Sequence, residues 1–323
     1  MTDTEATKRP RAQWAHLFFG KDGLRAGWSM ALFLVLVTVL TFVAVAVTTG
    51  FHQPTTSKAG TPQPVWPTIG VEAASFAVVG LAAFIVSLVE RRPFTRYGLR
   101  REAMLPDLLK GMAWGLAMLS VLTGLLALAG ALVFDGVALS AGAALTYGAL
   151  WLVAFALVGL FEEFLTRGFL QYTLARGVAG IVTAVAPNNR HARTIGFWGA
   201  AAVFSVGLFA IGHLFNKGET AMGLVSVALA GLTFAYVLYR TGSLWWAIGF
   251  HATWDWAQSF LYGVPDSGAM MQGHLLVTHP VGATLLSGGP TGPEGSVLIV
   301  PTLLLTLVII HRTLPRRATA FDA

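Results

Sequence analysis

The chain of 323 residues is 55% hydrophobic and only 11% charged, whereas a soluble domain is about 25% charged. Together with a mean hydropathy of +0.68, this composition excludes an ordinary soluble domain and indicates a polytopic membrane protein. The absence of cysteine excludes disulfides, a thiolate nucleophile and a cysteine-based metal site.

Several apolar runs, each near the length of about 20 residues that crosses a bilayer, follow a polar and basic segment at residues 1–26. We predict an all-α transmembrane helix bundle of about eight spans, at residues 27–49, 68–89, 108–134, 141–174, 195–215, 222–239, 243–261 and 297–310. The fourth run is too long for one perpendicular crossing, so we expect it to tilt or to project from the membrane.

The predicted spans divide the chain into four parts. A cytoplasmic segment at residues 1–26 precedes three N-terminal spans within residues 27–140. A core at residues 141–260 contains the next four spans. An outer loop rich in Gly and Pro, the last span and a cytoplasmic tail follow at residues 261–323.

The basic residues predict the orientation, because cytoplasmic loops of membrane proteins carry an excess of Lys and Arg. With cytoplasmic N- and C-termini, 19 of the 21 basic residues fall on inner segments, and only Lys58 and Lys217 fall outside. We therefore predict a multi-pass protein of the cell membrane. Because the basic residues are spread over several short connections rather than gathered in a patch, we do not expect nucleic acid as a partner.

Glu162, Glu163 and Arg167 interrupt a run that is otherwise apolar. A charge at the centre of a bilayer costs about 2.5–3.5 kcal/mol on insertion scales. Glu163 and Arg167 are four residues apart, so they share a helix face and are expected to pair. That pair would leave Glu162 to face a cavity. The alternative is that all three residues form only a structural ion-pair network.

Two further spans carry ionisable residues. His213 lies near the end of the fifth span, and His251 and Asp255 lie four residues apart in the seventh. Asp255 could accept a hydrogen bond from His251 and fix its tautomer. A packing histidine and a structural His–Asp pair are the alternatives. Ionisable groups in membranes face the bundle interior, so we expect these residues to gather.

Such a group around a water molecule is suited to hydrolysis. Glu162 would act as general base on the water, and His213 would hold that water or a metal carrying it. His251 and Asp255 would stabilise the oxyanion, Asp255 directly only if it is protonated. The candidate ligands for a possible zinc ion are Glu162, His213, His251 and Asp255, although the sequence lacks a His-Glu-x-x-His motif.

Three short motifs in this order resemble the signature of the CPBP intramembrane proteases, which include the type II CAAX prenyl endopeptidases and bacteriocin-processing proteins. The resemblance covers about residues 141–260 and rests on Glu162-Glu163-x-x-x-Arg167, Phe209-x-x-x-His213 and His251-x-x-x-Asp255. It implies an endopeptidase that hydrolyses a peptide bond of a membrane-associated or lipidated protein or peptide.

The resemblance also implies roles for individual residues. Glu162 becomes the water-activating carboxylate with Glu163 and Arg167 as its supporting pair, His213 the second water-holding residue, and His251 the group on the oxyanion side. The family has been described both as metalloproteases and as glutamate-dependent proteases. The chain departs from the family at Asp255, where Asn is usual, and an ionised carboxylate there would repel an oxyanion.

Two other functions fit the same residues. Carboxylate–histidine relays also mark ion pathways, so an ion- or proton-coupled transporter is the first alternative, although no inverted repeat is visible. A catalytically silent scaffold of the same fold is the second. The predicted spans raise one difficulty for a shared site: they place Glu162 toward the cytoplasmic end of its helix and His213 toward the outer end of its own.

Overall fold

The computed structural model describes residues 15–20, 23–49, 61–214, 216, 218–319 and 321. Its helices are α1 (Ala15–Phe18), α2 (Ala26–Thr49), α3 (Val65–Glu90), α4 (Met104–Leu128), α5 (Ala141–Glu163), α6 (Gln171–Val185), α7 (Ala192–Ala202), α8 (Ala210–His213), α9 (Ala221–Thr241), α10 (Trp245–Trp256), α11 (Thr284–Ser287) and α12 (Ile299–Thr313). The π-helical segments Phe164–Leu170, Val203–Phe209 and Ala257–Leu261 extend α5, α7 and α10. The strands are β1 (Phe19–Gly20), β2 (Gly23–Leu24), β3 (Leu132–Val137) and β4 (Leu276–Pro280).

Six helical stretches in the described ranges are long and apolar enough to cross a membrane: Ala26–Thr48, Val65–Glu90, Met104–Leu128, Ala141–Val185, Ala192–His213 and Ala221–Thr241. The chain is therefore a mostly helical, multi-pass membrane protein. The seventh and eighth predicted spans correspond to shorter helices, α10 with its π-helical extension and α12. The count of eight spans and the cytoplasmic termini stay predictions, and residues 1–14, Lys58 and Lys217 lie outside the described residues.

The predicted end of the third span, residue 134, is wrong. Helix α4 ends at Leu128 because Gly130 adopts a left-handed conformation (φ +68°), which stops a helix. The chain then continues as β3, which pairs antiparallel with β4, with Leu132 opposite Pro280 and a bulge between Phe134 and Gly136. The outer loop therefore contributes a strand, which its Gly- and Pro-rich composition did not indicate.

The fourth predicted span is one long helix. Helix α5 passes through the π-helical segment into α6 without interruption, so the helical stretch covers Ala141–Val185. This length removes the difficulty over depth, because Glu162 lies near the middle of the stretch rather than at one end. Ser140 caps its start by accepting a hydrogen bond from the backbone N–H of Ala143.

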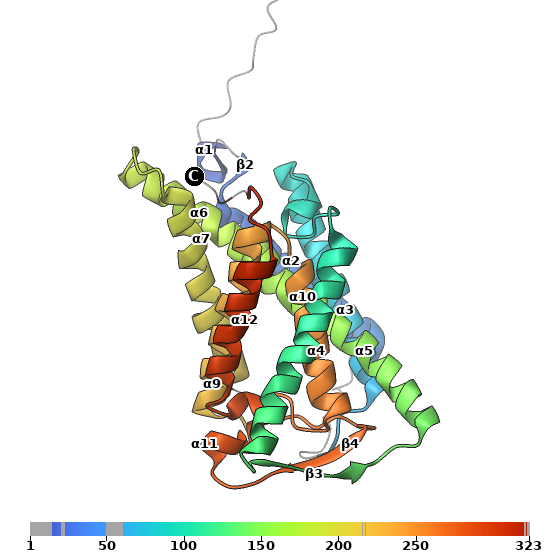
Figure 1. The fold of residues 1–323 in the computed structure, drawn as a ribbon. Helices are drawn as coiled ribbons and strands as arrows, with labels where there is room; N and C mark the ends of the chain where they lie inside the picture. Colours follow the sequence, from blue (N-terminus) through green and yellow to red (C-terminus); the bar gives the residue numbers. More distant parts are fainter. Residues whose placement is uncertain are drawn as a thin grey trace, which may run out of the picture.

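Helix α10 packs between α4 and α5 (Figure 1). Glycines make this contact close: a Cβ atom on Gly111 or Gly115 of α4 would lie 2.1 Å or 2.2 Å from the carbonyl oxygen of Trp246 or Phe250. On α10, a Cβ atom on Gly249 would lie 2.2 Å from the Leu108 carbonyl oxygen. Small residues permit such close packing of membrane helices. The packing fixes α10, which carries His251 and Asp255.

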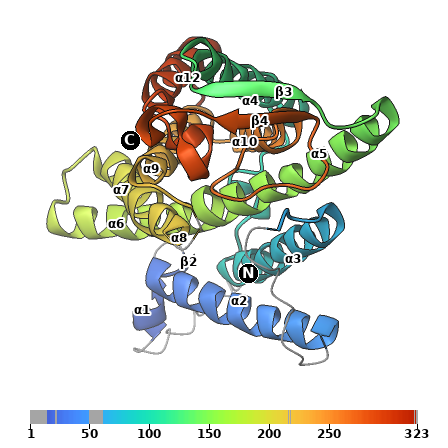
Figure 2. The same ribbon diagram turned by 90° about the horizontal axis from the view of Figure 1, so that it is seen from below.

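The two ends of the bundle differ. Helix α1 and the described C-terminal residues lie at one end, and β3, β4 and α11 lie at the other (Figures 1 and 2). The C-terminal segment is anchored by Arg317, whose Nη1 lies 2.9 Å from Oδ2 of the buried Asp107 at the start of α4. The first and last described residues thus lie on the same side of the bundle. This placement agrees with an even number of membrane crossings.

The predicted orientation can be tested with single cysteines, because the chain has none of its own. Val281 is 41% exposed and lies just beyond β4, whereas Asn188 is exposed in the α6–α7 connection at the opposite end. We expect a membrane-impermeant maleimide to label Val281→Cys in intact cells and Asn188→Cys only after permeabilisation. The reverse labelling pattern would show that the orientation is inverted.

Candidate active site

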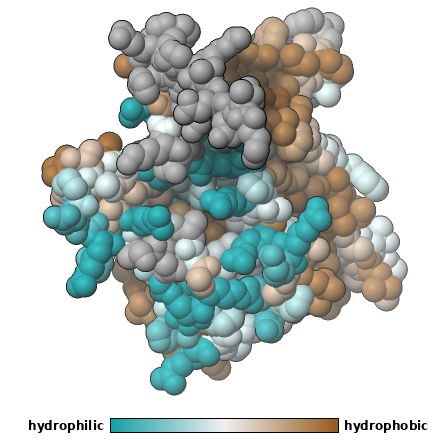
Figure 3. All heavy atoms as spheres, turned by 90° about the horizontal axis from the view of Figure 1, so that it is seen from above, coloured by the Kyte–Doolittle hydropathy of each residue, from teal (hydrophilic) through white to brown (hydrophobic). Residues whose placement is uncertain are grey.

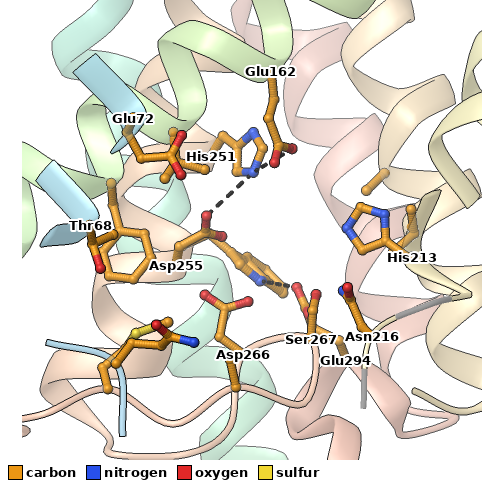
Figure 4. Close-up of a pocket in the computed structure, with 18 of the residues that line it drawn as sticks. Thr68, Glu72, Glu162, His213, Asn216, His251, Asp255, Asp266, Ser267 and Glu294 are labelled. Carbon is orange, nitrogen blue, oxygen red and sulfur yellow. Dashed lines mark hydrogen bonds and ion pairs between the residues drawn. The ribbon is translucent and has the colours of Figure 1, made fainter. Parts of the chain in front are cut away.

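A cavity of about 610 Å³ lies inside the bundle. Its walls come from α3, α5, α9, α10 and α12, from the end of α8 and from the loops that follow α10 (Figure 4). Four of the residues predicted for a site, Glu162, His213, His251 and Asp255, line it. The other two, Glu163 and Arg167, lie behind its wall and are 0% and 1% exposed.

His251 is the residue that joins the group together. Its Nδ1 atom lies 3.1 Å from Oε1 of Glu163, and its Nε2 atom lies 3.3 Å from Oδ2 of Asp255 and 3.9 Å from Oε2 of Glu162. The ring of Phe234 stacks against the imidazole, with ring centroids 5.8 Å apart. Each ring nitrogen thus faces a carboxylate, and the orientation of the imidazole is fixed from three sides.

The ion pair predicted from the spacing of Glu163 and Arg167 is present. Arg167 Nη1 lies 2.9 Å from Glu163 Oε1, and the same nitrogen donates to Thr166 Oγ1 at 2.9 Å. Glu163 also contacts His251, which sequence reasoning missed. The signal was Gly159, one turn before Glu163, where a Cβ atom would lie 3.0 Å from the Ile248 carbonyl oxygen. A glycine there marks the helix face that α10 approaches.

Glu162 and His213 face the cavity from different sides. The side chain of Glu162 is 28% exposed, in contrast to the fully buried Glu163 beside it. Figure 4 shows His213 across the cavity from His251 and Asp255, with Glu162 above the space between them. The geometry therefore separates the two neighbouring carboxylates as expected: one is buried in an ion pair, and the other reaches into the cavity.

The cavity also contains carboxylates that were not predicted: Glu72 on α3, and Asp266 and Glu294 in the loops after α10 (Figure 4). Trp254 donates from Nε1 to Glu294 Oε1 at 2.9 Å, and Ser259 donates to Asp266 Oδ2 at 3.1 Å. Glu72 interrupts an apolar run and could have been found on the same grounds as Glu162. Asp266 and Glu294 lie in turn-rich loops, where a carboxylate is ordinary.

Two tryptophans of α10 differ in their environment. Trp254 lines the cavity, and its hydrogen bond holds Glu294 at the wall. Trp256 donates from Nε1 to the carbonyl oxygen of Gly148 at 2.8 Å. It therefore holds α10 against α5 and does not line the described cavity.

Asp266 gives the cavity a predicted pH dependence. Burial raises its pKa well above the usual carboxyl range, and the nearby charges of Asp255 and Glu294 raise it further. The folded state therefore holds a proton that the unfolded state releases, so stability falls as the pH rises from the usual carboxyl pKa through the raised one. We expect Asp266→Asn to flatten this fall in a pH series of thermal unfolding in detergent. Asp135→Asn, in an exposed pair with His279, serves as control, and an unchanged slope in Asp266→Asn would contradict the expectation.

The candidate metal site has no support. Within the described ranges, no group of three or more His, Asp or Glu side chains is placed to hold a metal ion. His213 lies across the cavity from His251 (Figure 4), and both nitrogens of His251 already face carboxylates. Zinc coordination needs ligands converging on one point at about 2 Å. The description as a metalloprotease is therefore not carried further.

The fold and the site define a multi-pass membrane protein whose bundle encloses acid–base residues from separate helices. Residues 144–257 match the family model described as type II CAAX prenyl endopeptidase Rce1-like. Over this segment the chain is similar to the CPBP family, in agreement with the resemblance carried by the three motifs. The matched segment contains all six predicted site residues but not Glu72, Asp266 or Glu294. No curated protein and no solved structure matches the chain.

Proposed function

We propose that this protein is an intramembrane endopeptidase of the CAAX type in the cell membrane. Its substrate is a membrane-associated or lipidated protein or peptide. The observation that carries the proposal is the cavity in which Glu162, His251 and Asp255 lie together and His213 faces them, within the segment that matches a protease family. The match to a protease family favours this function over a transporter or a silent scaffold.

The proposed reaction begins with a water molecule between Glu162 and His213. Glu162 takes a proton from the water, whose oxygen forms a bond to the carbonyl carbon of the substrate. The electron pair of the carbonyl moves onto its oxygen, and His251 stabilises that oxyanion from the side of its Nε2 atom. Glu162 then returns the proton to the amide nitrogen as the carbon–nitrogen bond breaks.

The supporting residues act through His251 and Glu162. Glu163, neutralised by Arg167, holds Nδ1 of His251, so that Nε2 is directed to the cavity. Asp255 accepts from Nε2 in the resting site and is a positioning residue. In this division of roles, the buried pair Glu163–Arg167 orients His251, and Glu162, which reaches into the cavity, takes part in the reaction.

The direction of access follows from the residues at the rim. Gln63, Pro67 and Asn216 are exposed and line the cavity together with the loop that contains Asp266 and Ser267. Gln63 and Asn216 lie in connections and Pro67 in the first turn of α3, at the end of the bundle that carries β3 and β4. We propose that the substrate enters there, on the side that the basic residues predict to be outside the cytoplasm.

The role of Asp255 predicts a difference between two substitutions. Asp255→Asn keeps an acceptor for His251 Nε2 and removes a negative charge beside the oxyanion, so we expect cleavage to stay within about tenfold of the unmodified protein. Asp255→Leu removes the acceptor and should lower kcat by roughly 10²-fold, the scale of one lost oxyanion interaction. The measurement is cleavage in detergent solution. Equal inactivation by both substitutions would mean that the carboxylate itself takes part in proton transfer.

The proposed function is tested by comparing the membrane proteins of cells that carry the unmodified chain or Glu162→Ala. We expect an uncleaved protein or peptide to accumulate in the Glu162→Ala cells, and its identity gives the substrate. Purified protein should cleave that substrate equally well with and without a divalent-metal chelator. An unchanged set of membrane proteins would contradict the proposal, and activity lost to the chelator and restored by zinc would contradict its metal-free form.

A further inference from the structure

A second, larger cavity lies at the end of the bundle that carries the chain's described ends. This arginine cleft has a volume of about 1480 Å³ and is bounded by the α3–α4 connection, α6, the start of α7 and the C-terminal segment. Figure 3 looks onto this end and shows hydrophilic residues gathered there, with hydrophobic surface at the periphery. The two cavities share no lining residue, although Arg167, which pairs with Glu163 behind the active-site wall, reaches the wall of the cleft.

The charge of the arginine cleft is one-sided. Eight arginines and a single carboxylate, Glu102, line it, and no lysine, histidine or aspartate does so among the described residues. One of the eight, Arg167, is neutralised by Glu163 and does not add to the charge of the cleft. Four of the arginines come from the α3–α4 connection and the others from segments distant in sequence, such as Arg25 and Arg193. The expectation that the basic residues form no patch is therefore wrong. Connections separated in the sequence meet at one end of the bundle.

The inner wall of the cleft is held in place by a buried carboxylate. Glu90 is 2% exposed at its side chain; its Oε2 lies 3.2 Å from Arg92 Nε, and its Oε1 lies 2.5 Å from Arg176 Nη2. One carboxylate faces two guanidinium groups, so the three side chains together carry a net positive charge. Nε and Nη1 of Arg176 have no hydrogen-bond acceptor within the described part of the chain. These two donors are buried, so a ligand would meet the exposed arginines of the cleft, such as Arg96 and Arg101. Arginine suits a phosphate because it binds the group through paired N–H donors.

Helix α6 combines the two surfaces that a phospholipid needs. Tyr172, Arg176 and Thr183 lie on its face toward the cleft. Ile181 and Val185, in its last turns, are 66% and 82% exposed. Arginines that serve only to set the orientation of a membrane protein do not need to line a cavity. Here they surround a cavity, and exposed aliphatic side chains lie beside it. Basic pockets between membrane helices on the cytoplasmic side bind the headgroups of anionic lipids.

We propose that the arginine cleft binds a phosphate group, carried by an anionic phospholipid whose acyl chains lie along the aliphatic side of α6. The inference does not depend on the proposed protease activity. Arg96 and Arg101 are exposed lining residues, so substituting them leaves the buried contacts of Glu90 intact. The matched control is Arg190 and Arg312, which are exposed at the same end of the bundle and do not line the cleft.

The test uses purified protein in a neutral detergent and measures binding of short-chain phosphatidylglycerol, short-chain phosphatidylcholine and inorganic phosphate by thermophoresis. We expect phosphatidylglycerol to bind more tightly than phosphatidylcholine. The double variant Arg96→Gln/Arg101→Gln should raise its Kd by about fivefold for each arginine removed. The control Arg190→Gln/Arg312→Gln removes the same charge and should leave the Kd within about twofold.

The outcomes separate the two sources of phosphate. If phosphatidylglycerol binds with the arginine dependence above and inorganic phosphate does not, the cleft is a lipid site. If inorganic phosphate binds with the same dependence and displaces the lipid, the phosphate chemistry holds and the ligand is the free ion. Equal weakening by both double variants, or none by either, would overturn the proposal, because binding would then not come from the cleft.

Discussion

Glu162→Gln is expected to lower kcat by about 10²–10⁴-fold, the range that a positioned general base contributes. Gln keeps the size of the side chain and its hydrogen bonds but cannot take a proton from water. Glu162 is the carboxylate of its pair that reaches into the cavity, and it lies 3.9 Å from Nε2 of His251. The measurement is the rate of single-turnover cleavage by protein in detergent, which separates the chemical step from substrate binding.

Glu72 provides the matched control, because it is a second carboxylate in the wall of the same cavity. Figure 4 shows it on the far side of Asp255 from His213, so Glu162 is better placed than Glu72 to share a water with His213. We expect Glu72→Gln to retain activity within about tenfold. Equal losses in the two variants would mean that the cavity needs its total negative charge and that Glu162 is not the particular base.

Arg167→Met is expected to destabilise the protein by about 3–5 kcal/mol, the cost of removing one partner from a buried ion pair. Glu163, 0% exposed, would be left as a buried carboxylate without its cation. Its remaining partner would be His251, whose orientation depends on the same oxygen atom. Thermal unfolding in detergent, followed by the fluorescence of the ten tryptophans, measures the loss.

The double variant Glu163→Gln/Arg167→Met checks the cause. Gln removes the uncompensated charge and can still accept a hydrogen bond from Nδ1 of His251, so most of the lost stability should return. Activity need not return with it, because His251 would keep its position but lose a charged neighbour. A double variant that is no more stable than Arg167→Met would contradict an electrostatic origin and point to lost packing against Phe234, which lies 5.9 Å from the guanidinium carbon.

The helices were predictable because their apolar runs are long and their breaks are marked by charge, Gly or Pro. The errors lie where the chain departs from that pattern. Residues 132–134 are apolar enough to continue a span but begin a strand, because Gly130 ends α4 and β4 is available to pair. The outer loop pairs with a segment more than 130 residues away, and no local pattern specifies such a contact.

The site residues could be predicted where a charged side chain lies in an apolar run, because burying it there costs free energy. Glu162, Glu163 and Arg167 stand out in an apolar run, and their division into a buried pair and a cavity carboxylate followed from helix geometry. Asp266 and Glu294 carry no such signal, because turns accept carboxylates freely and only the folding of the loop brings them to the cavity. The arginine cleft was missed for a related reason: its lining residues come from segments that are far apart in the sequence.

The proposed hydrolysis of a peptide bond within a membrane is tested directly by reconstituting the protein in liposomes. Purified protein in liposomes is incubated in heavy-oxygen water with the membrane protein that accumulates in Glu162→Ala cells. We expect new termini, with one heavy oxygen incorporated into the new carboxyl group, and no such product from Glu162→Gln. An intact substrate together with a proton or ion flux through the same liposomes would contradict the proposed hydrolysis. It would indicate that the cavity is part of a transport pathway.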